Sequence, residues 1–148
     1  MTDTVVIHKL ARGKVSGDAW TALDLRIGLL HETSTAAPTV DDEFVADLVP
    51  ASNELVNDDY TRVALASLAA TWNATTKLYE LTADDVTWAA MTGATLTQGV
   101  KGYFVYVDVT DDSDSWLVRT VIYSTAETFN GSDYIVGWDS TGVLTVGV

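Results

Sequence analysis

The clearest alternation of apolar and polar positions in the first half of the chain lies between Leu25 and Leu30. In an extended segment, Leu25, Ile27 and Leu29 point to one side and the intervening residues point to the other. This period of two predicts a β-strand from Trp20 to Leu30, clearest from Leu25 onward.

The segment from Gly102 to Asp108 is apolar on both of its sides. Tyr103 and Val105 share one side, and Phe104 and Tyr106 share the other. A strand that reads apolar throughout is typically covered on both faces. The pattern therefore predicts either a central strand or a strand whose second face is covered by a partner protein.

A turn of acidic and hydroxyl residues, Asp111 to Ser115, separates this segment from a second apolar run, Trp116 to Tyr123. A connection this short cannot cross over a sheet, so we expect the two strands to be antiparallel neighbours. We also expect Asp139 to Gly142 to join the last two strands as a hairpin loop. Further strands are predicted at Tyr60–Ala66, Lys77–Leu81, Val86–Ala89, Tyr134–Trp138 and Val143–Val148.

One short helix is expected after the loop that contains Pro38. Thr39 is placed to cap its first turn, where the acidic residues that follow meet the positive end of the helix dipole. Val45 and Leu48, together with Phe44, would anchor this helix against the sheet.

The elements together predict an all-β fold, an antiparallel β-sandwich of jelly-roll-like or immunoglobulin-like type with at most one short helix. A chain of 148 residues fits one domain. We expect residues 1–17 to form an amino-terminal arm or an ordinary first strand, and residues 18–148 to form a single β-sandwich domain. The first stretch carries Lys9, Arg12 and Lys14 against Asp3 alone.

The net charge of −13 argues against nucleic acid as a partner, because a nucleic-acid binder needs a basic surface. It argues against an anionic membrane for the same reason. The chain has no cysteine, which excludes disulfides and thiolate metal sites. Its amino terminus lacks the pattern of a secretory signal, and no apolar run approaches the ~20 residues of a membrane span.

Candidate chemistry is sparse, so we expect no enzymatic activity and no cofactor. Asp111, Asp112 and Asp114 are a weak candidate for calcium, but the cluster lacks the glycine and closing glutamate of a helix-loop-helix site. A solvated hairpin tip is the favoured interpretation. His8 and His31 are the only histidines, which makes a catalytic zinc site improbable.

The tryptophans have two interpretations. As sugar-stacking residues they would form an exposed platform, and Trp72 and Trp116, which flank turns, are the candidates for it. As packing residues they would anchor the core or an interface. Trp88 and Trp138 lie in predicted strands and are expected in the core.

Four pieces of the chain form a recognisable series. In order they are Asp18–Trp20 with Leu25–Leu30, then Leu81–Trp88, then Gly102–Tyr106, then Ile135–Thr145. The most specific parts are Asp-Asp-Val-Thr-Trp and Trp-Asp-x-x-Gly. Together the pieces resemble a family of structural proteins from the virions of tailed bacteriophages, and the match spans roughly residues 15 to 148.

The resemblance implies a virion protein made in the host cytoplasm, most simply a capsid cement or decoration protein that binds and stabilises the assembled head shell. The implied partners are the major capsid protein and further copies of the chain, with a trimer suiting three-fold lattice positions. The expected contact residues are Lys9, Arg12 and Lys14, the loop from His31 to Pro38, and Trp116. A tail or connector component and a carbohydrate- or receptor-binding module of a head or tail fibre remain the alternatives.

Overall fold

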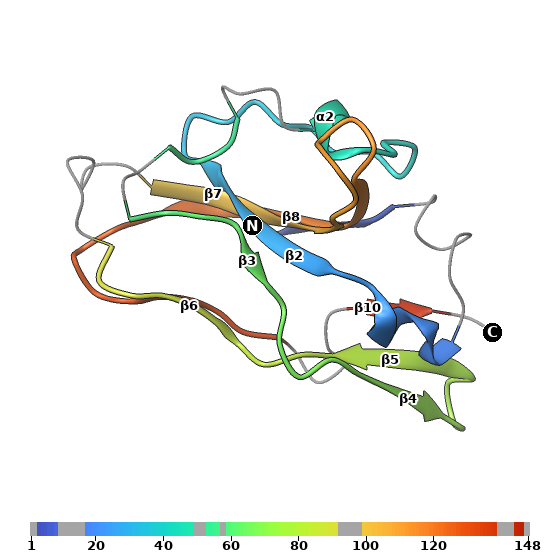
Figure 1. Cartoon of the computed structure of the whole chain (residues 1–148). Helices are drawn as coiled ribbons and strands as arrows, with labels where there is room; N and C mark the ends of the chain where they lie inside the picture. The colour runs from blue at the N-terminus through green and yellow to red at the C-terminus, as the bar shows by residue number, and fades with distance from the viewer. Residues whose placement is uncertain are drawn as a thin grey trace.

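A computed structural model describes residues 3–8, 17–48, 53–56, 59–91, 99–138 and 144–146. Among these residues the strands form three antiparallel sheets, ordered β1-β8-β7-β2-β3, β10-β5-β4 and β6-β9 (Figure 1). The elements are β1 (Thr4–Ile7), η1 (Gly17–Ala22, a 3-10 helix), β2 (Leu25–His31), α2 (Val45–Leu48), β3 (Val63–Ala64), β4 (Ala69–Asn73), β5 (Leu78–Thr82), β6 (Val86–Trp88), β7 (Gly99–Val107), β8 (Trp116–Thr128), β9 (Tyr134–Val136) and β10 (Leu144–Val146).

The prediction of a mostly β, antiparallel fold with one short α-helix is confirmed. The strand β7 lies at the centre of the five-stranded main sheet, between β8 and β2. The turn from Thr110 to Asp114 joins β7 to β8 as antiparallel neighbours, with Val107 opposite Trp116. The short connection predicted this pairing correctly.

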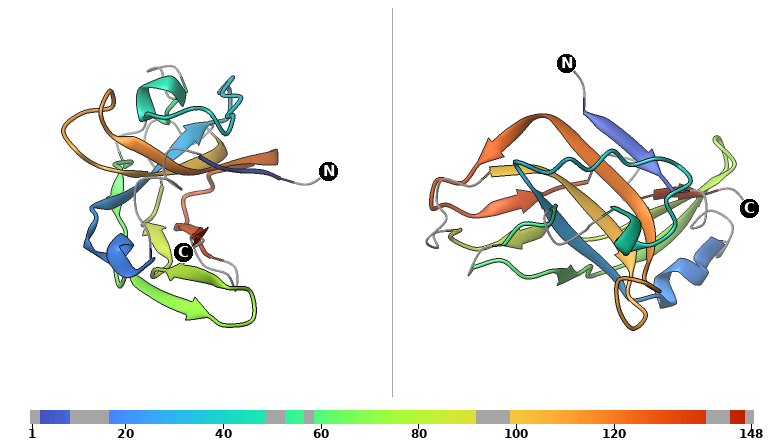
Figure 2. Two further views of the ribbon diagram at one scale, coloured as in Figure 1. Left: turned by 90° about the vertical axis from the view of Figure 1, so that its right-hand side faces the viewer. Right: turned by 90° about the horizontal axis from the view of Figure 1, so that it is seen from above.

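Both faces of the main sheet are covered (Figure 2). The helix α2 and its flanking loops lie on one face, and the two small sheets lie on the other. The alternation in β2 and β7 matches this arrangement, because the odd-numbered residues from Leu25 to Leu29 and from Tyr103 to Val107 face the small sheets. The residues buried on the helix side are Leu30, Val45, Leu48, Phe104, Tyr106 and Leu117.

The larger core lies between the main sheet and the small sheets. Trp20 is fully buried there and its ring centroid lies 5.7 Å from that of Trp116. Trp88 is also buried, and its indole nitrogen donates to the carbonyl of Thr61 at 2.8 Å. Trp138 is half-buried against the same core. The expected core position of Trp88 is therefore confirmed, whereas Trp138 lies beyond the end of β9 and is only partly buried at the edge of this core.

Three local predictions are wrong. Trp20 lies in η1 and not in a strand, because the extended segment begins only at Leu25. The last two strands do not form a hairpin, since β9 pairs with β6 and β10 pairs with β5. The helix is a single turn that begins at Val45, and the carboxylate of Asp47, not Thr39, accepts the backbone N–H of Phe44 at 2.9 Å.

The first strand also belongs to the main sheet, and it is followed by a buried histidine. Thr4 to Ile7 pair with β8, and His8 next to them is fully buried. The Nε2 atom of His8 lies 2.8 Å from the hydroxyl of Thr120. Burial lowers the pKa of His8 below its ordinary value of 6.5, although the charge of Asp42 opposes part of this change.

Gly102 allows β7 and β8 to approach each other. A Cβ atom at this position would overlap the backbone carbonyl oxygen of Val121, which cannot rotate away. We expect Gly102→Ala to lower the free energy of unfolding by about 2 kcal/mol, measured by urea denaturation. Gly137→Ala is the matched control, because its Cβ would meet only the flexible carboxylate of Asp85. Equal losses in both variants would contradict this account.

The buried imidazole of His8 makes stability depend on pH. Below pH 6.5 the unfolded chain takes up a proton that the folded protein, with its lower pKa, does not, so acid favours unfolding. Relative to His8→Gln, which does not titrate, the native protein loses up to about 1.4 kcal/mol per pH unit between pH 6.5 and the folded pKa. Urea denaturation across this range measures the difference. A constant difference between the two proteins would show that His8 titrates normally when folded.

Candidate functional site

Trp116, one of the expected contact residues, is buried in the core and cannot contact a partner protein. It was expected to be exposed because it flanks a turn, but only 5% of it is exposed. Trp116 is the first residue of β8. Its side chain lies on the face of the main sheet that is covered by the small sheets, where it packs on Trp20. Alternation along β8, and not distance from the turn, decides where this side chain points.

Trp72 is the exposed member of the tryptophan pair that the sequence singled out. It is 40% exposed and lies near the end of β4, directly opposite Tyr79 of β5. The two ring centroids are 5.1 Å apart. The pair presents a partly exposed aromatic surface close to the turn that joins β4 and β5.

The loop from His31 to Pro38 lies on the same side of the main sheet as α2 (Figure 1). His31 is half-buried, and its Nδ1 atom accepts the backbone N–H of Thr33 at 3.1 Å. The buried Asn53 connects this loop to α2, because its side chain accepts the N–H of Thr35 and donates to the carbonyl of Leu48. The loop is therefore held in place by defined hydrogen bonds.

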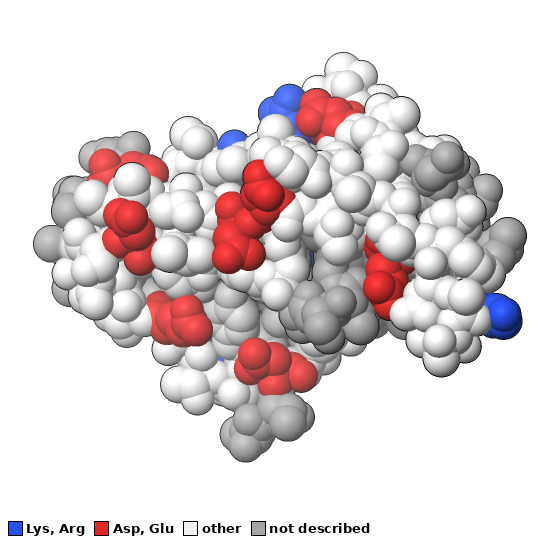
Figure 3. Space-filling model, turned by 90° about the horizontal axis from the view of Figure 1, so that it is seen from below, with Lys and Arg blue, Asp and Glu red and all other residues white. Residues whose placement is uncertain are grey.

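Lys9, Arg12 and Lys14, the expected basic contacts, lie outside the described residues. Two of the described basic residues are engaged within the protein. Arg26 pairs with Asp24 at 2.9 Å and with Asp108 at 3.3 Å, and Arg62 pairs with two other carboxylates. Viewed from the side of the small sheets, the described surface shows many acidic and few basic side chains (Figure 3).

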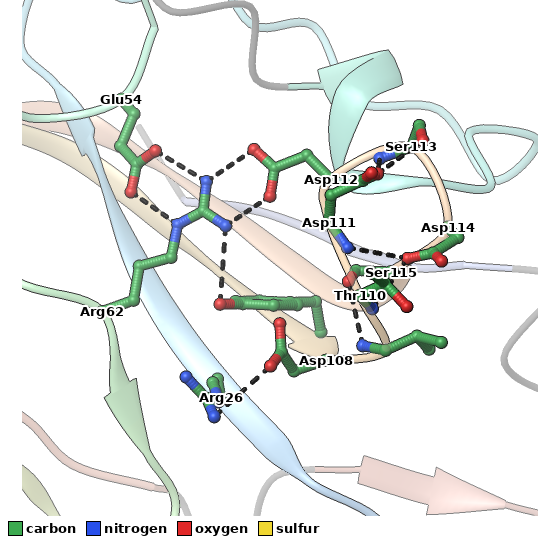
Figure 4. A network of polar contacts seen from close by, with 12 residues as sticks. Arg26, Glu54, Arg62, Asp108, Thr110, Asp111, Asp112, Ser113, Asp114 and Ser115 are labelled. Atoms are coloured by element: carbon green, nitrogen blue, oxygen red, sulfur yellow. Dashed lines mark hydrogen bonds and ion pairs between the residues drawn. The ribbon is translucent and has the colours of Figure 1, made fainter.

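Arg62 forms the most extensive polar network among the described residues (Figure 4). Its guanidinium donates to both oxygens of Glu54 at 2.7 Å, and to the two oxygens of Asp112 at 2.5 and 2.8 Å. The same group lies 5.3 Å from the ring centroid of Phe104 and 5.2 Å from that of Tyr106. Arg62 thus joins the segment before β3, the segment after α2 and the β7–β8 turn.

The environment of Arg62 keeps it charged. Burial works to lower its pKa, but the hydrogen bonds to Glu54 and Asp112 outweigh burial and raise the pKa above its ordinary value. Tyr60 extends the network, because its hydroxyl donates to Glu54 at 2.8 Å and accepts the N–H of Leu29 at 2.9 Å. Burial raises the pKa of Tyr60, so this hydroxyl stays neutral.

The carboxylates of the β7–β8 turn are used within the turn. Asp111 accepts the backbone N–H of Ser113 at 2.8 Å, and Asp114 accepts the N–H groups of Thr110 and Asp111, both at 2.9 Å. These backbone donors hold the pKa of Asp114 below its ordinary value. Asp112 points away from the other two to Arg62. Within the described part of the chain no group of three potential ligands converges on a metal position.

A hollow of about 260 Å³ lies where β1 and β8 pass close to β9. It is on the same face of the main sheet as the larger core. Tyr123, which lines it, has its hydroxyl 3.0 Å from that of Tyr134. Burial raises the pKa of Tyr123 to about 12, so the hollow keeps a neutral phenol. Its lining residues are Asp3, Val5, Tyr103, Arg119, Val121, Tyr123, Glu127, Ile135, Val136 and Gly137.

The Asp-Asp-Val-Thr-Trp motif lies beside the start of the last piece of the sequence resemblance. β6, which contains the Val-Thr-Trp part of this motif, pairs with β9, with Val86 opposite Val136. The indole nitrogen of Trp138 donates to the carbonyl of Asp84 at 3.0 Å. Of the Trp-Asp-x-x-Gly motif, Trp138 alone belongs to the described residues. The side chains of Val86, Trp88 and Val136 are buried and serve packing.

Sequence reasoning missed Arg62, Glu54 and Asn53. An isolated arginine between two predicted strands carries no motif, and its two carboxylate partners lie 8 and 50 residues away. The one feature of the sequence that could have indicated Arg62 was charge. In a chain with 21 acidic and 8 basic residues, an arginine is expected to form an ion pair.

Comparisons with protein-family models, with curated proteins and with solved structures found no match to this chain. Within the described residues, no helix has the length and apolar character needed to cross a membrane.

Loss of the Arg62 side chain should destabilise the fold. Arg62→Ala leaves the carboxylate of Glu54, which is 20% exposed, without its cation, and it uncovers the rings of Phe104 and Tyr106. Asp112 is 41% exposed, so solvent screens that pair and it contributes less. We expect the free energy of unfolding to fall by about 2 kcal/mol, measured by urea denaturation.

Arg26→Ala is the matched control for this prediction. Its ion pair with Asp24 joins side chains that are 38% and 47% exposed, so its loss should cost less than about 1 kcal/mol. Arg62→Lys should recover only part of the stability, because an ammonium group has three N–H donors and cannot replace the four bonds that the planar guanidinium makes to Glu54 and Asp112. Equal costs for Arg62→Ala and Arg26→Ala would show that the network adds nothing to an ordinary surface pair.

Proposed function

We propose that this protein is a structural protein of a bacteriophage virion, a capsid cement or decoration protein that binds the assembled head shell. The observation that carries the proposal is the pairing of β6 with β9. It places the Asp-Asp-Val-Thr-Trp motif, Asp84 to Trp88, beside Ile135 to Trp138, the start of the last piece of the sequence resemblance. Residues that serve strand pairing and packing suit a protein that acts by binding another protein and not by catalysis.

The proposed mechanism is mass action. A protein that binds only the assembled shell lowers the free energy of that state, by ~2.7 kcal/mol per site at a hundredfold excess over the dissociation constant. Many copies on one particle would add their contributions. The net charge of −13 keeps unbound copies apart and suits a basic or mixed-charge surface on the shell.

The proposed contact surfaces are the basic stretch that contains Lys9, Arg12 and Lys14, and the loop from His31 to Pro38. The loop is fixed by the hydrogen bonds of Asn53, so it would bind with little loss of conformational entropy. The major capsid protein is the proposed partner. A homo-oligomer, with the trimer as the preferred form, is proposed because three copies suit a three-fold position on an icosahedral shell.

The finer architecture proposed with this function is a β-sandwich of jelly-roll-like or immunoglobulin-like type. Support comes from the larger core, which packs the main sheet against the two small sheets. Such a body has loops at its ends and strands at its edges, and these are the parts that a shell subunit would contact.

The second candidate function is a carbohydrate-binding module, and the exposure of Trp72 favours it. An indole that is 40% exposed and braced by Tyr79 has the flat apolar face on which a sugar ring stacks. This candidate requires that the isolated protein is retained on host polysaccharide and that Trp72→Ala abolishes retention. If the Trp72→Ala variant binds to shells as well as the unchanged protein does, the result favours the cement role.

The experiment that tests the cement role is particle binding. Purified protein is mixed with assembled particles that lack it, and occupancy is measured by sedimentation and by gold labelling in the electron microscope. We expect label over the whole shell. Replacing Lys9, Arg12 and Lys14 together by alanine should weaken binding about tenfold, at about 0.5 kcal/mol for each lost ion pair.

A matched control replaces Lys77 and Lys101, which lie outside the basic stretch, and should leave occupancy unchanged. Substitution is preferable to deletion of the first residues, because Thr4 to Ile7 form β1 of the main sheet. Label confined to one vertex would reject the cement role and support a tail or connector component. Unchanged occupancy in the triple variant would remove the basic stretch from the contact.

A further inference from the structure

Among the described strands, none pairs with the outer edge of β1. β1 is the last strand of the main sheet, and among the described strands only β8 pairs with it. The N–H of His8 donates to the carbonyl of Val118 at 3.0 Å, so by antiparallel alternation the backbone groups of Val6 also face β8. Those of Val5 and Ile7 therefore face outward, as a template for another strand.

The hollow of about 260 Å³ adjoins this edge. Val5, which is 51% exposed, and Ile135 of β9, which is 57% exposed, are two of its apolar lining residues. A strand added along β1 would place the residue opposite Val5 near these two apolar residues, because side chains of paired residues lie on the same face. The edge and the hollow thus form one continuous surface.

The charges of the hollow indicate which side chain would enter it. Among the described lining residues, Asp3 and Glu127 contribute two carboxylates and Arg119 contributes one guanidinium, so the carboxylates are in excess. The backbone N–H of Ser124 donates to Asp3 at 2.9 Å and fixes that carboxylate in place. A lysine or arginine has an apolar stem for Val5 and Ile135 and a cation for the carboxylates.

We propose that the outer edge of β1 binds an extended segment of a partner protein as a sixth strand of the main sheet, with a lysine or arginine side chain in the hollow. At this edge a second copy of this chain is a poorer occupant than a basic segment, because the chain has a net charge of −13 and the lining residues Asp3 and Glu127 are acidic. The proposed homo-oligomer would use another surface. The inference deepens the proposed function and rests on it only for the identity of the partner, a shell subunit.

The test is a titration of the isotope-labelled protein, followed by the backbone amide signals in its NMR spectrum. The probe is a blocked peptide, Thr-Val-Lys-Val-Thr, and the comparison peptide carries glutamate in place of lysine. We expect saturable shifts at Val5 and Ile7 with the lysine peptide, and binding of the glutamate peptide at least about threefold weaker.

A pair of protein variants locates the charge effect. Glu127→Gln should weaken binding of the lysine peptide about threefold, the loss of one exposed ion pair. Glu43→Gln is the matched control, since Glu43 is exposed and precedes α2 on the opposite face of the main sheet, and it should change nothing.

Several results would overturn the proposal. One is the absence of shifts at Val5 and Ile7 with the peptide in large excess, and another is equal binding of the lysine and glutamate peptides. A dimer in sedimentation that blocks the peptide would assign the edge to a second copy. The titration contains no phage particle, so its failure is separate from a failure of shell binding, and either result can stand without the other.

Discussion

The fold depends on one constraint, the need to cover both faces of β7. Tyr103 and Val105 face the small sheets and Phe104 and Tyr106 face α2, and all four are buried. Each such side chain contributes roughly 1.5–3 kcal/mol when it is removed from water, so a sheet left open on either face would lose much of its stability. The remaining elements are arranged as the two covers of this strand.

The two covers are closed in different ways. On one face, η1 and the small sheets supply many apolar side chains, including Trp20 and Trp88. On the other face the cover is a one-turn helix with loops, and a helix so short has little stability of its own. Arg62 closes this thinner side, because its guanidinium lies over two aromatic rings and pairs with Glu54 and Asp112.

Different parts of the chain serve packing and the proposed binding of a partner. The segments Asp84 to Trp88 and Ile135 to Trp138 are used in the pairing of β6 with β9. The parts proposed to contact a partner, among the described residues, are the loop from His31 to Pro38 and the outer edge of β1, which lie at the margins of the main sheet. A protein that binds through edges and loops can vary them while it keeps its core.

Three local features could be predicted from the amino-acid sequence: the alternation from Leu25 to Leu29, the two apolar faces of β7 and the turn that pairs β7 with β8. Each follows from the period of a strand or the length of a connection, which neighbouring residues set. The pairing of β9 with β6, the burial of Trp116 and the contacts of Arg62 with Glu54 and Asp112 became apparent only in the folded protein. These outcomes depend on contacts between residues far apart in the chain, and strand periodicity carries no information on which distant segment will supply the contact.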